Sequence, residues 1–184
     1  MAATFPGTTI EITKLESGSS RALFDGIFAT GGITLSQVSI MTGLEPYLIQ
    51  NWVKRGFVSH PEGRVYSRKQ FARIVIINML KESLQMEKIC AMIHIIIGNP
   101  SDKNDDLISD DELYHRYVDM LSCNDINVTD EKSVEKAACN AAAMCAVSDI
   151  GKKKQLADIF RTMLYAHMAA EIRAMASGIL SDLQ

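Results

Sequence analysis

The chain of 184 residues contains few cysteines, prolines and aromatic residues, and it has no long apolar run. Its four cysteines include no CxxC pair, which is typical of a reduced interior rather than of a disulfide-linked secreted domain. No apolar stretch approaches the roughly 18 residues that a membrane-spanning helix needs. The N-terminus lacks the basic start followed by an apolar stretch that marks a signal peptide. We therefore expect a cytoplasmic protein that makes no contact with a membrane.

The sequence also lacks a strong charge of one sign, since its formal net charge is −3. That value argues against non-specific coating of nucleic acid, but the charge is unevenly distributed. Residues 34–97 carry a net charge of +4, whereas residues 1–33 carry −1 and residues 98–184 carry −6. A basic module on an otherwise acidic chain is typical of a nucleic-acid reader joined to a second unit.

Motifs for catalysis and for metal binding are missing as well. We find no Ser/Cys–His–acid grouping, Gly-rich phosphate loop or paired-carboxylate motif, so we predict no enzymatic activity and no cofactor. Cys90 and His94 lie four residues apart on a predicted helix, as half of a metal site could. The remaining cysteines and His115 have a spacing that fits no metal site. We predict no bound metal and interpret the cysteines as small buried hydrophobic residues.

What the sequence does contain is a close series of helix start and stop signals between residues 34 and 56. Residues 34–37, Thr-Leu-Ser-Gln, form a capping box that opens a short helix. Gly43 ends this helix, and Pro46 stands where a second helix begins. The second helix, 46–55, ends at Gly56. Two short helices joined by such a turn predict a helix-turn-helix.

The pattern that follows is typical of a wing and a further helix. Residues 57–58 and 65–66 are β-like pieces on either side of the turn 60–63, which predicts a small hairpin. Residues 67–70, Ser-Arg-Lys-Gln, form a second capping box and open a long helix. Another helix starts near residue 86, and Gly-Asn-Pro at 98–100 ends it.

The C-terminal half is predicted to be entirely helical. A third capping box occupies 109–112, and Thr129 caps an Ala-rich helix. The last helix carries apolar residues at three- and four-residue spacing through 156–179. The expected fold is therefore mainly α, with a winged helix-turn-helix domain followed by an all-α domain. We divide the chain into an N-terminal arm 1–33, a winged-helix domain 34–97, a linker 98–108 and a helical dimerisation or effector domain 109–184.

A winged helix that binds DNA needs polar and basic side chains on the exposed face of its second helix. Ile49, Trp52 and, at least in part, Val53 are expected to face inward, which leaves the opposite face for DNA. The candidate DNA-binding residues are Tyr47, Gln50, Asn51, Lys54 and Arg55 on the helix, His60, Arg64 and Tyr66 on the wing, and Arg68 and Lys69 on the following helix.

These residues resemble a known family. The stretch LIQNWVKRGFVSHPEGRVYSRKQFARI, 48–74, is similar to the DNA-binding domain of MerR-type regulators, which has a Pro-bearing wing and an Arg-x-Tyr-Ser signature opening a helix. Here Pro61 and Arg64-Val65-Tyr66-Ser67 match that pattern. A closer likeness is to an uncharacterised bacterial domain-of-unknown-function family with a MerR-like N-terminal half. Its Asn-x-Val-Lys helix appears at 51–54, and the resemblance covers about 34–180.

The resemblance implies a sequence-specific transcriptional regulator that binds double-stranded DNA as a homodimer. Helix 46–55 would enter the major groove, and the wing 57–66 would contact the backbone. It also leaves open a small-molecule effector of the C-terminal half, and a dimer or ligand role for the stripe of Met163, Met168 and Met175. For the dimer interface, we favour the last helix.

The sequence departs from the MerR pattern on the second helix. Gln50 and Asn51 stand where the family has an Arg and an aromatic residue, and Trp52 is the aromatic that remains. This departure keeps open a non-catalytic protein-interaction or adaptor module on a winged-helix scaffold. A further alternative is an excisionase-like architectural DNA-binding protein, since those proteins use a related fold.

Overall fold

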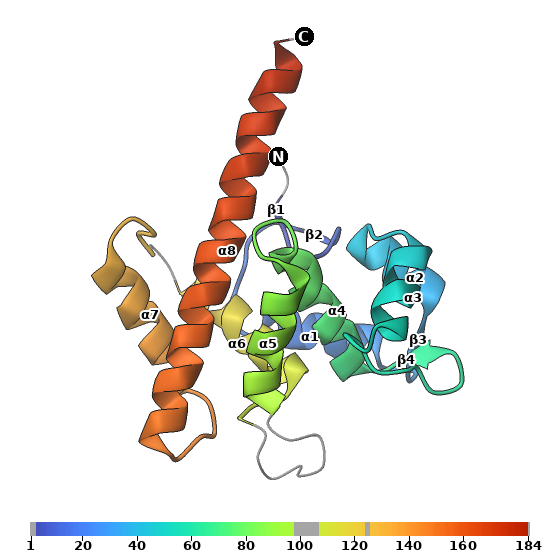
Figure 1. Ribbon diagram of the computed structural model, residues 1–184, viewed down its shortest axis with the longest axis horizontal. Coiled ribbons are helices and arrows are strands. Elements are labelled where there is room, and N and C mark those ends of the chain that lie inside the picture. The colour runs from blue at the N-terminus through green and yellow to red at the C-terminus, as the bar shows by residue number, and fades with distance from the viewer. Residues whose placement is uncertain (1–2, 98–106, 124–125, 184) are drawn as a thin grey trace.

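The computed structural model describes residues 3–97, 107–123 and 126–183, and over these ranges the chain is mainly helical, as predicted (Figure 1). Eight helices and four two-residue strands make up the described elements. In chain order they are β1 Ala3–Thr4, β2 Glu11–Ile12, α1 Ser19–Ile27, β3 Ile33–Thr34, α2 Leu35–Thr42, α3 Pro46–Lys54, β4 Val65–Tyr66, α4 Arg68–Leu80, α5 Met86–Ile97, α6 Asp110–Ser122, α7 Glu131–Ala143 and α8 Ile150–Asp182.

The predicted start and stop signals around α2, α3 and α4 are confirmed. Thr34 accepts a hydrogen bond from the backbone N–H of Gln37, whose side chain bonds back to Thr34, so the capping box is complete. A second complete box opens α4 at Ser67. Gly43 adopts a left-handed conformation with φ of 68° at the end of α2, and Pro46 is the first residue of α3. Local chemistry therefore fixes these boundaries.

Two predicted caps in the C-terminal half differ in the structure. Ser109 is the N-cap residue of α6, but its side chain makes no capping hydrogen bond. Glu112, the expected partner in that box, instead accepts hydrogen bonds from Arg21 and Arg116. The cap of α7 is Asp130, whose side chain accepts from a backbone N–H of the first turn, so the prediction of Thr129 is one residue too early.

The predicted hairpin between 57–58 and 65–66 is wrong in its first strand. β4 pairs with β3 in antiparallel register, with Ile33 opposite Tyr66. The backbone N–H of Phe57 donates to the carbonyl oxygen of Trp52 at 2.9 Å, and Gly56, with φ of 77°, lies between them. This is the Schellman pattern that ends a helix, so the backbone at 57 is committed to α3 and forms no strand ladder.

The segment expected as an N-terminal arm is part of the fold. β1 and β2 pair with each other, and α1 packs against α6. Phe24 of α1 is fully buried, and its ring lies 5.3 Å from that of Phe71 and 5.5 Å from that of Tyr114 between centroids. These aromatic contacts attach α1 to α4 and α6, because burying three rings together removes a large apolar area from water.

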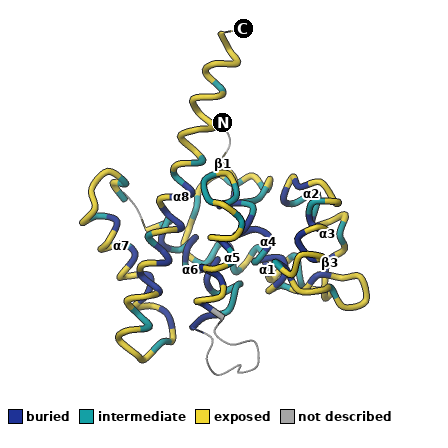
Figure 2. Tube along the Cα trace, in the orientation of Figure 1, coloured by how far each residue is buried: buried dark blue, intermediate teal, exposed yellow. Residues whose placement is uncertain are grey.

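A single hydrophobic cluster includes residues of both predicted domains, with α4 at its centre (Figure 2). Nine of the 13 residues of α4 are buried, and the helix packs against α6 and α8. The predicted helix stop at 98–100 and most of the predicted linker lie outside the described residues. Leu107 and Ile108, at the end of that linker, are buried, and the backbone N–H of Leu107 donates to the carbonyl oxygen of Ile96 at 2.7 Å.

The last helix, α8, divides into a buried and an exposed half. Residues from Leu156 to His167 include eight buried positions that pack against the rest of the molecule. Beyond Met168, which still packs on the core, the helix projects away from the body, as Figures 1 and 2 show, and most of its side chains are exposed. Among the described helices, none combines the length and the hydropathy needed to cross a membrane.

Candidate nucleic-acid interface

The turn between α2 and α3 is anchored by residues distant in sequence. Thr9 donates its backbone N–H to the carbonyl oxygen of Met41 at 2.9 Å and its hydroxyl to that of Ile40 at 2.7 Å. The side-chain amide of Asn78, in α4, donates to the carbonyl oxygen of Thr42 at 2.9 Å. The carbonyls at the end of α2 are thus satisfied by the N-terminal segment and by α4. No local sequence signal links Thr9 and Asn78 to the turn, so their role was not predictable from the sequence.

The inner face of α3 is as predicted. Ile49, Trp52 and Val53 are 0%, 2% and 7% exposed, and they belong to the core. Their burial fixes the rotation of α3 about its own axis. The opposite side of the helix must therefore face solvent.

The outer side of α3 presents what we name the α3 face: Tyr47, Gln50, Asn51 and Lys54. Their spacing of three, four and seven residues from Tyr47 places them on one side of the helix. All four are exposed, Tyr47 by 70%. Within the described residues, none of these side chains makes a hydrogen bond or an ion pair. The α3 face therefore offers two free amides, a phenol and an ammonium group to a partner.

The loop 57–64 beside α3 is anchored to α4 by the side chain of Gln70. The side-chain amide of Gln70 donates to the carbonyl oxygens of Ser59 at 3.0 Å and His60 at 2.9 Å. The end of the loop is a tight turn with a 3.0 Å hydrogen bond from Val65 N–H to the Glu62 carbonyl oxygen. The loop thus has a defined position relative to α4.

Arg64 occupies the third position of this turn. Its φ is 67°, and Gly63 before it has a φ of 57°. Two consecutive left-handed residues define a type I′ turn, a conformation that costs free energy for a side chain other than Gly, Asn or Asp. Arg64 is the one non-glycine residue with positive φ among the described residues, and its side chain is exposed. Backbone strain at an exposed cation is a feature of binding sites.

The predicted cations near α3 differ in how they are paired. Lys54, Arg64 and Lys69 are exposed and make no ion pair with the described residues. Arg55 is engaged, because its guanidinium lies 4.5 Å above the ring of Phe57 and 3.5 Å from a carboxylate oxygen of Glu87. Three positive charges are therefore free for a partner.

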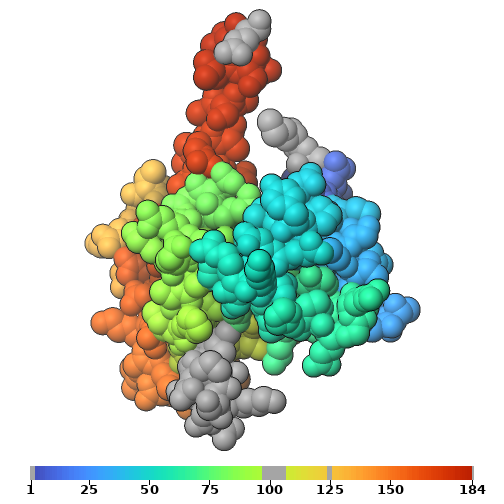
Figure 3. Space-filling model, turned by 45° about the vertical axis from the view of Figure 1, so that its right-hand side comes forward, coloured from blue at the N-terminus to red at the C-terminus, as the bar shows by residue number. Residues whose placement is uncertain are grey.

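A groove of about 910 Å³ brings several of these residues together. Lys54, His60 and Lys69 line it, and it runs between the end of α3, the loop 57–64 and the start of α4. In Figure 3, α3 and the loop lie on the face turned to the viewer, with α5 beside them. Glu62 and Asp110 also line the groove, so its charge is mixed rather than uniformly basic.

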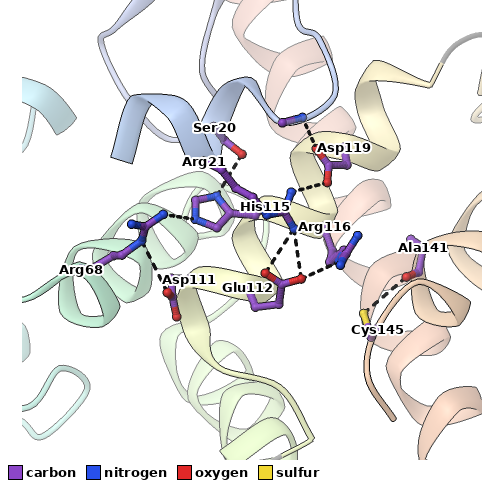
Figure 4. A network of polar contacts seen from close by, with 11 residues as sticks. Ser20, Arg21, Arg68, Asp111, Glu112, His115, Arg116, Asp119, Ala141 and Cys145 are labelled. Atoms are coloured by element: carbon purple, nitrogen blue, oxygen red, sulfur yellow. Dashed lines mark hydrogen bonds and ion pairs between the residues drawn. The ribbon is translucent and has the colours of Figure 1, made fainter. Parts of the chain in front are cut away.

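Two of the predicted site residues lie elsewhere. Tyr66 is 3% exposed, and burial raises the pKa of its phenol. Arg68 is half-buried and already paired, because its guanidinium contacts Asp25 at 2.5 Å. The same guanidinium lies 3.3 Å from Nε2 of His115 (Figure 4). Neither residue offers a free side chain to a partner, since Tyr66 belongs to the core and Arg68 is paired with residues of α1 and α6.

Cys90 and His94, which the sequence places four residues apart, have no third ligand near them in the part of the chain that the structure describes. Among the described residues, no group of three or more His, Cys, Asp or Glu side chains lies close enough together to hold a metal ion. Cys90 is half-buried, and desolvation raises the pKa of its thiol. His94 is exposed on the wall of the groove.

The fold and this surface define a mainly helical protein with an exposed polar helix face beside a loop anchored on α4. Residues 33–117 match the family described as "Domain of unknown function (DUF1836)", which supports the resemblance over that range, short of the expected 34–180. A protein of Bacillus subtilis (strain 168) described as "Uncharacterized protein YkrK" is 36% identical over 81 residues. The alignment covers 42% of this chain and 35% of that relative, so the chain spans about a third of the relative's length. No solved structure matches the chain.

Proposed function

We propose that the chain binds double-stranded DNA through α3 and the loop 57–64 and acts as a sequence-specific transcriptional regulator of MerR-like type. In this arrangement α3 enters the major groove and the loop serves as the wing on the phosphate backbone. The observation that carries the proposal is the α3 face, whose four exposed side chains have no partner within the described residues. Arg64 and Lys69 lie beside it as free cations suited to phosphates.

The chemistry of the α3 face suggests which bases are read. Gln50 and Asn51 carry amides, which pair bidentately with adenine N6 and N7. Lys54, one turn further along, suits guanine or a phosphate. The anions Glu45 and Glu62 are exposed near this surface, so non-specific attraction to the backbone is modest. We therefore expect base contacts, rather than bulk charge, to supply much of the affinity.

The projecting half of α8 supports a homodimer. Ile172, Met175 and Ile179 follow one another at three- and four-residue spacing, and they are 61%, 61% and 65% exposed. An apolar stripe with this spacing on a helix in solvent suits the seam of a helix pair. A second copy carries the same stripe, so the two can bury it in a two-fold arrangement. Two copies would present two α3 helices to successive major grooves.

Selection of bound sequences from random double-stranded DNA with the full chain tests the proposal. We expect enrichment of an inverted repeat, with adenine at positions that depend on Asn51. Asn51→Ala should lower affinity by about tenfold for the selected site, as loss of one bidentate contact predicts. Lys88→Ala removes an exposed charge on α5, outside the groove, and should leave affinity unchanged.

The same experiment separates the alternatives. Absence of any enriched sequence at low salt would overturn DNA reading and favour the adaptor module. Enrichment accompanied by strong DNA bending, with no change in transcription from a promoter carrying the site, would favour the excisionase-like architectural role instead.

A further inference from the structure

A second hollow lies between α6 and α7, distant in sequence from the α3 face. Its volume is about 380 Å³, within the range of small-molecule sites. At about 30 Å³ for each water-sized group, this space holds roughly a dozen non-hydrogen atoms. Lys136 and Met144, which line the hollow, are exposed, so a ligand can enter from solvent without a rearrangement of the helices.

The floor of the hollow is apolar because α7 contributes small residues there. Ala137 and Ala141 line the hollow together with Met120 of α6, and the two methyl groups are too small to fill the space between the helices. Met120 is 6% exposed, whereas Met144 at the rim is 70% exposed. A methionine side chain adapts its shape to an apolar partner, so Met144 can pack against the apolar part of a bound ligand.

The polar side of the hollow has an excess of positive charge. Arg116 and Lys136 line it, together with the carboxylate of Asp119. Asp119 is already occupied, since it accepts hydrogen bonds from Gly18 N–H at 2.8 Å and from Arg21 at 2.6 Å. Burial alone raises the pKa of Asp119, but these two donors outweigh burial and lower it, so the carboxylate stays ionised and paired.

Arg116 has donors left over for a ligand. Its Nε donates to Glu112 at 2.6 Å, and Glu112 also accepts from Arg21 (Figure 4). The two terminal nitrogens of Arg116 make no hydrogen bond with the described residues. Lys136 likewise makes no ion pair with them. Arg21 and Arg116 pair with the carboxylates of Glu112 and Asp119, so the ammonium group of Lys136 on the wall of the hollow is an uncompensated positive charge.

We propose that this hollow binds a small amphipathic carboxylate, of the class of medium-chain fatty acids. The carboxylate would accept hydrogen bonds from Arg116 and Lys136, and the alkyl chain would lie on Met120, Ala137 and Ala141. Guanidinium and ammonium groups bind a carboxylate through charge-assisted hydrogen bonds. The site does not depend on DNA binding, and its test needs no DNA.

Titration calorimetry of the full chain with butanoate, hexanoate, octanoate and decanoate tests the proposal directly. Affinity should rise by about fourfold for each added CH₂ group until the hollow is full, as apolar burial predicts. 1-Octanol and octylamine fill the same volume without a negative charge. Both should bind at least about tenfold more weakly than octanoate, because they lose the charge-assisted hydrogen bonds.

Three variants assign the binding to this hollow. Lys136→Gln should weaken octanoate binding by about tenfold, while Lys132→Gln, one turn earlier on α7 and outside the hollow, should leave it unchanged. Ala137→Leu fills the floor and should abolish binding of octanoate while butanoate still binds. Thermal unfolding of each variant shows whether the fold is retained.

Several results would overturn the proposal. The first is that none of the acids binds at millimolar concentration. The second is that octanoate and octanol bind equally well, and the third is that Lys132→Gln and Lys136→Gln have the same effect. A chain that binds octanoate but no DNA would leave this site intact and refute only the DNA-binding function.

Discussion

The side-chain amide nitrogen of Gln70 donates a 2.9 Å hydrogen bond to the carbonyl oxygen of His60. The amide oxygen of Gln70 accepts from the backbone N–H of Ser67 at 2.8 Å, which completes the capping box of α4. One side chain thus starts the helix and holds the loop 57–64. The helix cap was predictable from spacing alone, whereas its second role depends on where the loop folds.

Gln70→Glu separates these two roles. Glutamate keeps the acceptor for Ser67 N–H, but it replaces the donor to the loop by an oxygen that repels the carbonyls. We expect a loss of about 1–3 kcal/mol in the free energy of unfolding, because the carbonyls of Ser59 and His60 lose their donor and meet a buried carboxylate instead. Urea denaturation measures this loss. Gln37→Glu, in the equivalent box of α2, has no donor contact to lose and should change stability by less than about 0.5 kcal/mol. Equal losses would refute a loop-anchoring role.

Arg64→Gly tests whether the strained residue of the loop serves binding rather than stability. Glycine adopts a φ of 67° without steric cost, so the unfolding free energy should stay constant or rise by up to about 1 kcal/mol. If the proposed function holds, affinity for the selected DNA should nevertheless fall, because a phosphate contact is lost. Denaturant unfolding and gel-shift titration of the same preparation check both effects. A variant that is less stable and binds equally well would contradict this role.

The salt dependence of DNA binding follows from the unpaired cations. Lys54, Arg64 and Lys69 are free in each protomer. A dimer in which all of them meet phosphates should show a slope of log K against log salt of about −5. Arg64→Gly should reduce the magnitude of that slope by about 2 in the dimer, since each lost phosphate contact removes about 0.9. Anisotropy titrations between low and physiological salt provide the measurement. A slope near zero would mean that these lysines and this arginine do not face the backbone.

The sequence predicted what short-range chemistry controls and missed what tertiary contacts decide. The caps at Thr34 and Ser67 and the inward face at Ile49 and Trp52 follow from spacing of a few residues. The pairing of β3 with β4 joins positions more than 30 residues apart, and no hydrophobic alternation in two-residue strands reveals it. Arg68 illustrates the limit for the site. Its position on a helix start was correct, but the partners that occupy its guanidinium come from α1 and α6.

The free energy of unfolding should decrease as the pH is lowered from 6.5 to about 4, because two buried histidines stay neutral in the folded state. Burial lowers the pKa of His115 to about 4, with Arg21 and Arg68 contributing, and burial alone lowers that of His167 to about 4. The unfolded chain takes up these protons near pH 6.5, so protonation favours unfolding. Each histidine should lower the free energy of unfolding by about 1.4 kcal/mol for each unit by which the pH falls within this window.

Urea denaturation at pH 7, 6 and 5 measures this dependence. His167→Gln keeps a polar side chain beside the hydroxyl of Tyr117, which lies 2.8 Å from Nδ1 of His167. Because the variant removes one of the two histidines that titrate in this window, it should halve the slope of unfolding free energy against pH. An unchanged slope in His167→Gln would contradict the assignment of half the effect to this residue.

The projecting stripe of α8 leads to a prediction about assembly that is independent of DNA. Ile172→Lys with Met175→Lys places two charges on the stripe. The dissociation constant of a dimer held there should therefore rise by at least about tenfold. Because both side chains are exposed in the single chain, the fold of the protomer should be unaffected. Ser177→Lys adds a charge on the opposite side of the same exposed helix and should leave the dimer intact. Sedimentation velocity over a concentration series distinguishes these outcomes. A wild-type chain that stays monomeric throughout, or a dimer that survives both stripe charges, would mean that α8 does not hold two copies together.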